Sequence, residues 1–336
     1  MHATRQSIIL RRRPAGEPTV DDFSLTEEPM PTPGMGEVLT RTLWLSIDPG
    51  MRVRMKEAKS YAPRFEVGSP LMGETVGQVL VSNDARFVPG QIVVGARGWQ
   101  SHIVSDANTL TPLSANLPHS TYLGVLGMPG TAAYTGMKDI GQAKPGETVV
   151  ISAASGAVGS VAGQIAKRAG ARVIGIAGGA EKIAFVRDVL QFDDCIDHRK
   201  TSDLAESLKQ ACPDGIDVYF ENVGGAVQQA VFPLMNRFGR MVMSGMAAEY
   251  NDATPRPGPN LSATFLKRLR IQGFICGDQP ENFAEWRALA APWIEDGSLR
   301  YREHVVDGLA QAPQAMIDLA RGENFGKVLV SVSMPT

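Results

Sequence analysis

The segment best suited to ligand chemistry is a small-residue turn between an apolar run and an amphipathic run. Ala154, Gly156 and Gly159 take the three positions of a GxGxxG-type pattern, with alanine in the first. The middle position lets backbone approach a pyrophosphate, and the third lets the helix pack closely on the strand. Together with Ala157 and Val158, the two glycines are predicted to bind phosphate through N–H groups at the helix N-terminus. The alternative is a helix packed tightly on a sheet without a ligand.

The residues after the next apolar strand indicate which dinucleotide fits the turn. A site for NAD usually has Asp or Glu roughly 20 residues on, where the carboxylate binds the ribose hydroxyls. This strand ends in residues 176–180 without an acid, and Lys182 follows. An ammonium group attracts a 2′-phosphate, whereas a carboxylate repels it. The sequence therefore favours NADPH (NADP), unless Lys182 is an ordinary surface lysine.

The elements that must position these residues alternate between strands and helices after Pro129. Residues 148–154 are predicted as a buried strand and 158–169 as a helix, because apolar residues recur there at helical spacing. Residues 181–190 form the next predicted helix. This α/β alternation indicates a parallel sheet covered on both faces. The first 125 residues have short strand-like runs broken by Gly and Pro, which predicts a mostly β domain.

The overall composition is that of an ordinary globular protein. The chain has 336 residues, 43% of them hydrophobic, and a net charge of −2, and its length favours about two domains. The near-neutral charge argues against nucleic acid or an anionic membrane as a partner. Three cysteines without a CxxC pair argue against a disulfide framework and against a cysteine-rich zinc site. The sequence suggests neither a signal peptide nor a membrane span, so the cytoplasm is expected.

A series of motifs extends in order over nearly the whole chain. They are residues 45–49 (LSIDP), 98–100 (GWQ), 127–134 (GMPGTAAY), 153–160 (AASGAVGS), 177–182 (AGGAEK), 221–225 (ENVGG) and 324–327 (NFGK). Together they closely resemble the leukotriene/prostaglandin reductase branch of the zinc-independent medium-chain dehydrogenase/reductase family. That branch includes plant double-bond reductases and bacterial curcumin-type reductases.

The resemblance implies a fold, a reaction and further site residues. The fold is a GroES-like, mostly β catalytic domain over residues 1–127, completed by 301–336, and a Rossmann NADPH-binding domain over 128–300. The reaction is hydride transfer from NADPH to the β carbon of an α,β-unsaturated ketone or aldehyde, by an enzyme that is commonly a homodimer joined through its Rossmann domains. The implied further cofactor contacts are His198, Asn222, Ser244, Phe274, Ile275, Cys276 and Asn324. Both asparagines could instead serve local turns.

Tyr250 is the candidate catalytic residue and would also line the substrate pocket. It follows a predicted strand, and open α/β sheets bind ligands at the carboxyl ends of their strands. Segment 245–251 also resembles the family stretch that carries a functional tyrosine. A neutral phenol can donate a hydrogen bond to the negative charge that builds on the substrate carbonyl oxygen. The alternative is a tyrosine that packs against the cofactor ribose or a neighbouring loop. Tyr61 is a second pocket candidate, for which a packing role is equally plausible.

A metal is not expected. The zinc-dependent relatives need Cys or His ligands, but no cysteine precedes Cys195, and their Gly-His-Glu element is replaced by Met72-Gly73-Glu74. Methionine is a poor zinc ligand.

Two positions depart from the family pattern. His198 stands where many relatives carry a cofactor-contacting tyrosine, and Gly50 stands where a bulky tyrosine often forms a pocket wall. Three other functions stay open at this point. They are a zinc-free quinone reductase, a non-catalytic NADPH-binding sensor, and oxidation of a hydroxylated lipid by the same site in reverse.

Overall fold

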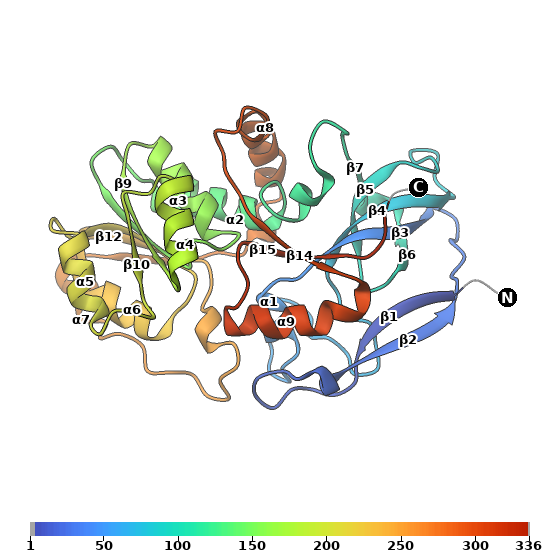
Figure 1. Ribbon diagram of the computed structural model, residues 1–336, viewed down its shortest axis with the longest axis horizontal. Coiled ribbons are helices and arrows are strands. Elements are labelled where there is room, and N and C mark those ends of the chain that lie inside the picture. The colour runs from blue at the N-terminus through green and yellow to red at the C-terminus, as the bar shows by residue number, and fades with distance from the viewer. Residues whose placement is uncertain (1–3, 335–336) are drawn as a thin grey trace. The chain divides into compact units, whose positions relative to one another are not determined.

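The computed structural model describes residues 4–334, which form two compact units. One unit contains the residues up to Gly124 together with those from Glu303 onward, and the other runs from Val125 to Arg302. Among the described residues, the first unit contains a two-stranded and a seven-stranded sheet and the second a six-stranded sheet (Figure 1). Each unit has a hydrophobic core of its own.

The second unit is built on a six-stranded sheet in which every neighbouring pair of strands is parallel. The strand order is β10-β9-β8-β11-β12-β13, so the chain starts in the middle, winds outward one way, and returns to wind the other way. This is the order 3-2-1-4-5-6 of a doubly wound nucleotide-binding sheet. The predicted fold class is therefore confirmed. The elements are α2 (Met128–Thr135), β8 (Thr148–Ser152), α3 (Gly159–Arg168), β9 (Arg172–Ala177), α4 (Ala180–Ala184), β10 (Asp194–Asp197), α5 (Leu204–Ala211), β11 (Ile216–Glu221), α6 (Gly225–Val231), β12 (Met235–Met243), α7 (Ser262–Lys267), β13 (Arg270–Gly273) and α8 (Glu281–Glu295).

Helices cover both faces of this sheet. On one face Tyr219 and Met241 share a buried core with residues of α5 and α6. On the other face Gly136, just after α2, lies so close to Phe220 and Val242 that any side chain there would collide with them. Strands buried on both faces need apolar residues at nearly every position, and all five residues of β8 are buried. This is why the centre of β8 has three apolar residues in a row, Val149, Val150 and Ile151, instead of an alternating pattern.

One predicted helix differs from the structure. Residues 181–190 were expected to form a single α-helix, but α4 ends at Ala184 and the chain continues as a wider π-helical turn, Phe185–Val189. There the N–H of Leu190 donates to the carbonyl of Phe185, five residues back, across 3.0 Å. Phe185 and Val186, at the start of this turn, are both buried.

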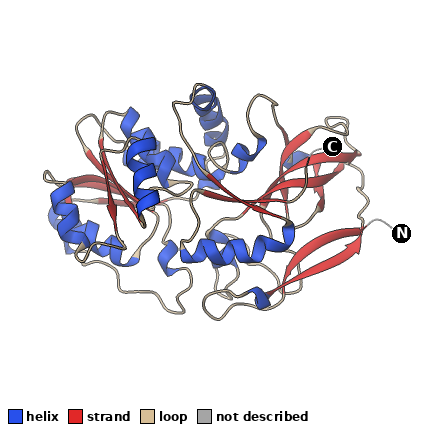
Figure 2. Cartoon of the chain, in the orientation of Figure 1, coloured by secondary structure: helices blue, strands red, loops and turns tan. Residues whose placement is uncertain are grey.

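The first unit is mostly β structure, as predicted (Figure 2). Strand β15 returns from the C-terminal part of the chain to pair antiparallel with β3, so that Val330 faces Leu45. Helix α9 packs on the same core through Met316. The last part of the chain thus completes the unit formed by the first part. The elements are β1 (Thr4–Leu10), β2 (Phe23–Pro29), β3 (Glu37–Ser46), α1 (Gly50–Arg54), β4 (Glu74–Ser82), β5 (Ile92–Arg97), β6 (His102–Asp106), β7 (Thr111–Pro112), β14 (Glu303–Asp307), α9 (Ala312–Arg321) and β15 (Lys327–Ser331).

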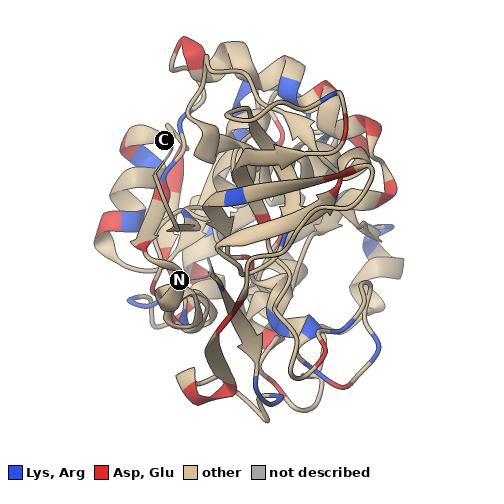
Figure 3. Ribbon diagram, turned by 90° about the vertical axis from the view of Figure 1, so that its right-hand side faces the viewer, with Lys and Arg blue, Asp and Glu red and all other residues tan. Residues whose placement is uncertain are grey.

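Charges of both signs are mixed along the chain. Figure 3 shows basic and acidic residues interspersed over the elements that face the viewer, in keeping with the net charge of −2. Within residues 4–334, no helix combines the length and the apolar composition that crossing a membrane requires.

Candidate cofactor and catalytic site

The turn after β8 has the close packing that its glycines predict. The chain leaves the strand through Ala153, whose φ of 49° is unusual for a residue with a side chain. A Cβ on Gly159 would collide with the Ala153 carbonyl and stand 3.1 Å from the Cα of Ala154. A Cβ on Gly156 would meet only that carbonyl oxygen, at 3.1 Å. Gly159 is therefore needed for helix–strand packing, whereas Gly156 leaves a nearly bare backbone facing open space.

Three backbone donors at this turn are left for a ligand. Helix α3 begins at Gly159, and the first intrahelical bond at its entry runs from the Ser160 N–H to the Gly156 carbonyl, 3.0 Å. No residue of the described chain accepts from the N–H groups of Ala157, Val158 or Gly159. Such orphan donors, at the positive end of a helix, bind a pyrophosphate well. The geometry fits the phosphate-binding role that the sequence predicts.

The ends of β8 and β11 are joined directly. The side-chain amide of Asn222 donates to the Ser152 carbonyl, 2.8 Å, and the Asn222 N–H donates to the Ser152 hydroxyl, also 2.8 Å. Asn222 therefore bridges two strands and does not serve its own turn, which was the alternative. Since β8 and β11 are the two strands at which the winding reverses, this contact lies where doubly wound sheets bind ligands.

A buried carboxylate organises the same edge of the sheet. One oxygen of Glu221 accepts from the Ser152 hydroxyl, 3.0 Å, and from the N–H groups of Val223, 2.7 Å, and Gly224, 3.0 Å. Glu221 is completely buried, and its second oxygen has no hydrogen-bond partner within the described residues. Glu221 and Ser152 were not predicted as site residues, although both stand at the carboxyl ends of strands that flank the switch point.

Tyr250 lies against this carboxylate-supported turn. The loop after β12, which carries Tyr250, is bonded to the end of β11. The N–H groups of Ser244 and Gly245 both donate to the Glu221 carbonyl, 2.9 and 3.1 Å. The Tyr250 hydroxyl accepts from the Met246 N–H, 3.2 Å, which leaves its own hydrogen for another acceptor. Burial raises the pKa of Tyr250, and the negative charge of Glu221 raises it further. The phenol is therefore neutral near neutral pH and able to donate.

His198, a predicted cofactor residue, lies at the end of β9 together with Arg199. The side chains of His198 and Arg199 both lie over Gly178, within 2.8 and 2.7 Å of the point where its Cβ would stand. Lys182 stands in α4, which begins just after this glycine, and burial together with the charge of Arg199 lowers its pKa. Arg199 was not predicted. It follows β10, and only the knowledge that β10 lies beside β9 in the sheet would have indicated it.

The remaining predicted cofactor residues of this unit lie along the same edge. Ser244 directly follows β12, and Phe274 directly follows β13. The side chain of Ile275 is 41% exposed, whereas Cys276 is buried and its thiol donates to the Met128 carbonyl, 3.8 Å. Cys276 is thus engaged in the packing of its own unit.

Tyr61 and Asn324 belong to the first unit. The Tyr61 hydroxyl occupies the space that a Cβ on Gly50 would need. The space beside Gly50, where relatives often carry a tyrosine, is therefore occupied by the Tyr61 side chain. Asn324 donates through its amide to the Gly326 carbonyl, 2.8 Å, which is the local turn contact considered as the alternative to a cofactor role.

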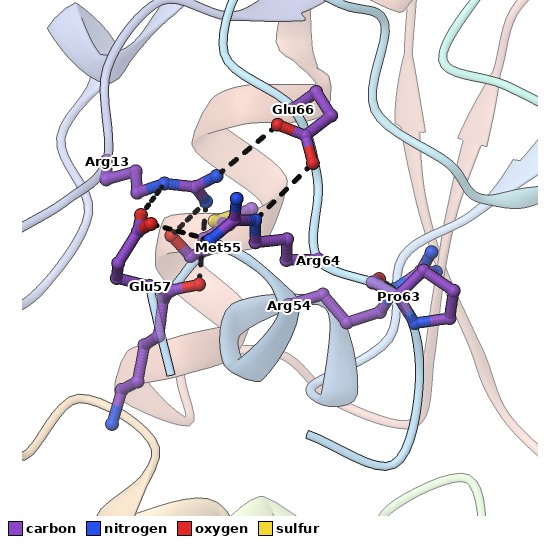
Figure 4. A network of polar contacts seen from close by, with 8 residues as sticks. Arg13, Arg54, Met55, Glu57, Pro63, Arg64 and Glu66 are labelled. Carbon is purple, nitrogen blue, oxygen red and sulfur yellow. Dashed lines mark hydrogen bonds and ion pairs between the residues drawn. The ribbon is translucent and has the colours of Figure 1, made fainter. Parts of the chain in front are cut away.

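An ion-pair network holds the loop that carries Tyr61 (Figure 4). Glu57 bridges Arg13 and Arg64, with nitrogen–oxygen distances of 2.6 Å to each. Arg54 donates to the Pro63 carbonyl, 2.7 Å. Single exposed ion pairs contribute little, at about 0–1 kcal/mol, but several contacts on one loop restrict its positions together.

The structure describes no group of three or more His, Cys, Asp or Glu residues that could hold a metal ion within residues 4–334.

The site combines a doubly wound sheet, orphan N–H groups at the turn after β8 and a neutral phenol on the loop after β12. These features define a dinucleotide-binding oxidoreductase.

Comparisons with known proteins specify this class further. Residues 6–113 match a family model described as the N-terminal domain of oxidoreductase, and residues 157–296 match one described as zinc-binding dehydrogenase. The chain is 45% identical to the NADPH-dependent curcumin reductase of Escherichia coli K12 over 332 residues, 97% of this chain and 96% of that one. It is 38% identical to the NADP(+)-dependent 2-alkenal reductase of Nicotiana tabacum over 336 residues, 98% of each.

A solved structure agrees with these relatives. The crystal structure of CurA from Vibrio vulnificus in complex with NADPH superposes with a TM-score of 0.93 at 46% identity, and covers 98% of this chain and 100% of that one. The chain belongs to the zinc-independent branch of the medium-chain dehydrogenase/reductase family that contains these reductases, as its motifs indicate.

Proposed function

We propose that this protein is an NADPH-dependent reductase of the carbon–carbon double bond in α,β-unsaturated ketones or aldehydes. The observation that carries the proposal is the combination of whole-length similarity to double-bond reductases with orphan N–H groups at the phosphate turn. NADPH bound at this turn supplies a hydride, which adds to the β carbon of the substrate. A proton added at the α carbon completes the reduction.

The residues of the chain have separate roles in this proposal. Ala157, Val158 and Gly159 bind the pyrophosphate, and Lys182 with its cationic neighbours binds the adenosine end. Asn222 orients the nicotinamide end at the switch point. Tyr250 donates a hydrogen bond to the carbonyl oxygen of the substrate, where negative charge develops, and a donor placed there stabilises the transition state more than the ground state.

The experiment that tests the proposal is a substrate panel with product analysis. Purified protein is mixed with NADPH and either a medium-chain 2-alkenal, a conjugated aryl enone or a simple quinone, and NADPH absorbance is followed. Saturated carbonyl products, identified by mass, are expected. Quinol as the only product would assign the protein to the quinone reductases instead. NADPH binding without turnover on any of these substrates would favour the non-catalytic sensor.

We also infer a homodimer that forms along the β13 edge of the parallel sheet. Strand β13 pairs with β12 on one side, and all four of its residues are exposed. Beside it in sequence, Leu261, Phe265 and Leu266 of the α7 region are 65%, 79% and 62% exposed. An exposed strand edge beside large apolar side chains favours association. Sedimentation velocity of the wild type and of Phe265→Arg tests this, and a wild-type monomer would contradict it. The cytoplasmic location stays a prediction that cell fractionation would test.

A further inference from the structure

Two side chains from the turn after the neighbouring strand, β10, lie across the end of β9. Because Gly178 has no side chain, the imidazole of His198 and the guanidinium of Arg199 can both lie across its backbone. Lys182, near the start of α4, is close enough for the charge of Arg199 to lower its pKa. The imidazole of His198 and the guanidinium of Arg199 thus lie together over the backbone of Gly178, and Lys182 follows in α4.

The turn that carries His198 and Arg199 is fastened in place. One carboxylate oxygen of Asp197 accepts from the Gly179 N–H and from the Arg199 N–H, each at 3.1 Å. Asp197 also pairs with Ala177 across the β10–β9 ladder. The N–H of His198 donates to the Ala177 carbonyl, 3.1 Å. These hydrogen bonds hold the backbone of residues 197–199 against the end of β9, so a ligand is not needed to order it.

We propose that Arg199 selects the 2′-phosphate of NADPH and that His198 takes up a proton when this phosphate binds. The proposal rests on the proposed function, because it assumes that NADPH is the cofactor. In doubly wound sheets an arginine near the end of the second strand accommodates the 2′-phosphate. A guanidinium can donate two parallel hydrogen bonds to a phosphate, which an ammonium cannot.

The surroundings of His198 favour its neutral form before the phosphate arrives. The side chain of His198 is exposed, yet the atoms packed against its ring lower the pKa of the imidazole by partial desolvation. The positive charges of Arg199 and Lys182 lower it further, while Asp197 raises it. These are the charged groups that act on the ring from the β10 turn and from α4. Glu181, also on α4, contacts Arg302 at 3.5 Å and acts on Lys182. A phosphate dianion placed among the cations reverses this balance and stabilises the imidazolium.

The sign of the pH dependence follows from this change. A group whose pKa rises on binding takes up a proton, so binding strengthens as the pH falls toward the free-state pKa. The affinity gain approaches about tenfold for each unit by which binding raises the pKa of His198. NADH has no 2′-phosphate, so its affinity should not change in this way. The preference for NADPH over NADH should therefore increase from about pH 8 to about pH 6.5, above the second phosphate pKa of about 6.

Isothermal titration calorimetry of the full-length protein with NADPH and with NADH tests both parts of the proposal. Titrations in buffers of different ionisation enthalpy count the protons taken up. We expect proton uptake with NADPH and none with NADH. NADPH binding whose affinity relative to NADH is independent of pH, without proton uptake, would overturn the role of His198. Failure to bind either nucleotide would contradict the proposed function itself, so the two failures are distinguishable.

Four variants separate the residues. Arg199→Gln should weaken NADPH at least tenfold and leave NADH unchanged. His198→Gln should bind NADPH weakly at every pH, whereas His198→Lys should bind it tightly and without the pH dependence. Lys200→Gln, which removes an exposed cation of the same turn, is the matched control and should behave like the wild type. Equal losses of NADPH affinity in Arg199→Gln and Lys200→Gln would show a general charge effect and overturn the role of Arg199.

Discussion

The side-chain amide of Asn222 donates to the backbone carbonyl of Ser152 across 2.8 Å and joins the ends of β11 and β8. These residues are 70 positions apart in the sequence, and only the parallel pairing of the two strands brings them together. The contact fixes the geometry of the edge at which the winding of the sheet reverses, where the nicotinamide end of the cofactor is proposed to bind.

Replacing Asn222 by Asp should therefore impair both stability and function. An aspartate cannot donate to the Ser152 carbonyl, and the carbonyl then loses its partner at a cost of about 1–3 kcal/mol. We expect a lower melting temperature and a lower kcat/KM. The control is Asn236→Ala, which removes an amide that donates to the Asp214 carbonyl, 2.9 Å, at the opposite end of the strands. It should lower stability without a change in kcat/KM.

The two glycines of the phosphate turn should respond differently to alanine. In Gly159→Ala the new Cβ meets the backbone of Ala153 and Ala154, and overpacking of this kind costs about 1–3 kcal/mol. In Gly156→Ala the Cβ has only one contact at 3.1 Å, so stability should change little while NADPH affinity falls, since the pyrophosphate cannot approach. Thermal unfolding and nucleotide titration of both variants check this, and unchanged NADPH affinity in Gly156→Ala would contradict the assignment of the turn.

Tyr250→Phe tests the proposed donor. The variant removes the hydroxyl but keeps the ring, so NADPH affinity should stay the same. If the phenol stabilises developing negative charge, kcat should fall by about 10²–10³, the usual cost of losing one such donor. The lost contact to the Met246 N–H should lower stability by about 1 kcal/mol. A variant with unchanged kcat and a similar loss of stability would assign Tyr250 to packing.

Glu221→Gln is expected to change the pH profile more than the fold. A glutamine oxygen can accept from Ser152, Val223 and Gly224 as the carboxylate does, whereas Glu221→Ala leaves these donors without a partner and should destabilise the protein strongly. The negative charge of Glu221 raises the pKa of Tyr250. Without that charge the pKa falls, so activity that needs the neutral phenol should be lost at lower pH than in the wild type. Rate profiles of both proteins over alkaline pH measure the shift, and identical profiles would contradict the coupling.

Gly50 and Tyr61 should control substrate preference together. The Tyr61 hydroxyl fills the space beside Gly50, so Gly50→Tyr displaces the Tyr61 side chain and exchanges one phenol for another. We expect a changed ratio of kcat/KM between a bulky aryl enone and a small 2-alkenal, with NADPH affinity unchanged. Tyr61→Ala should change the same ratio by opening the space. Ratios equal to the wild type in both variants would remove these residues from the substrate pocket.

Much of the fold follows from local sequence patterns. The apolar run of β8, the helical spacing of α3 and the turn glycines between them predict a strand–turn–helix unit, because burial and backbone freedom act within a few residues. The predicted helix over residues 181–190 remains helical but changes at Phe185 to a wider turn. The apolar pattern does not predict this change, because a single i→i+5 turn within a helix leaves the spacing of apolar residues almost unchanged.

The residues of the candidate site also fall into those that local sequence predicts and those that depend on tertiary structure. Gly156, Gly159, Lys182 and Tyr250 are recognisable from residue type and neighbours, since each has a chemical reason to stand after a particular strand. Glu221, Ser152 and Arg199 are not, because their importance depends on which strands lie side by side. Strand order is decided by packing between segments far apart in the chain, and it brings the β10 turn onto the end of β9 and Asn222 onto Ser152. The sequence by itself determined a dinucleotide-binding reductase fold and the type of its phosphate turn. Only the tertiary structure decided which charges surround the proposed adenosine site and which carboxylate accepts from the turn beside Tyr250.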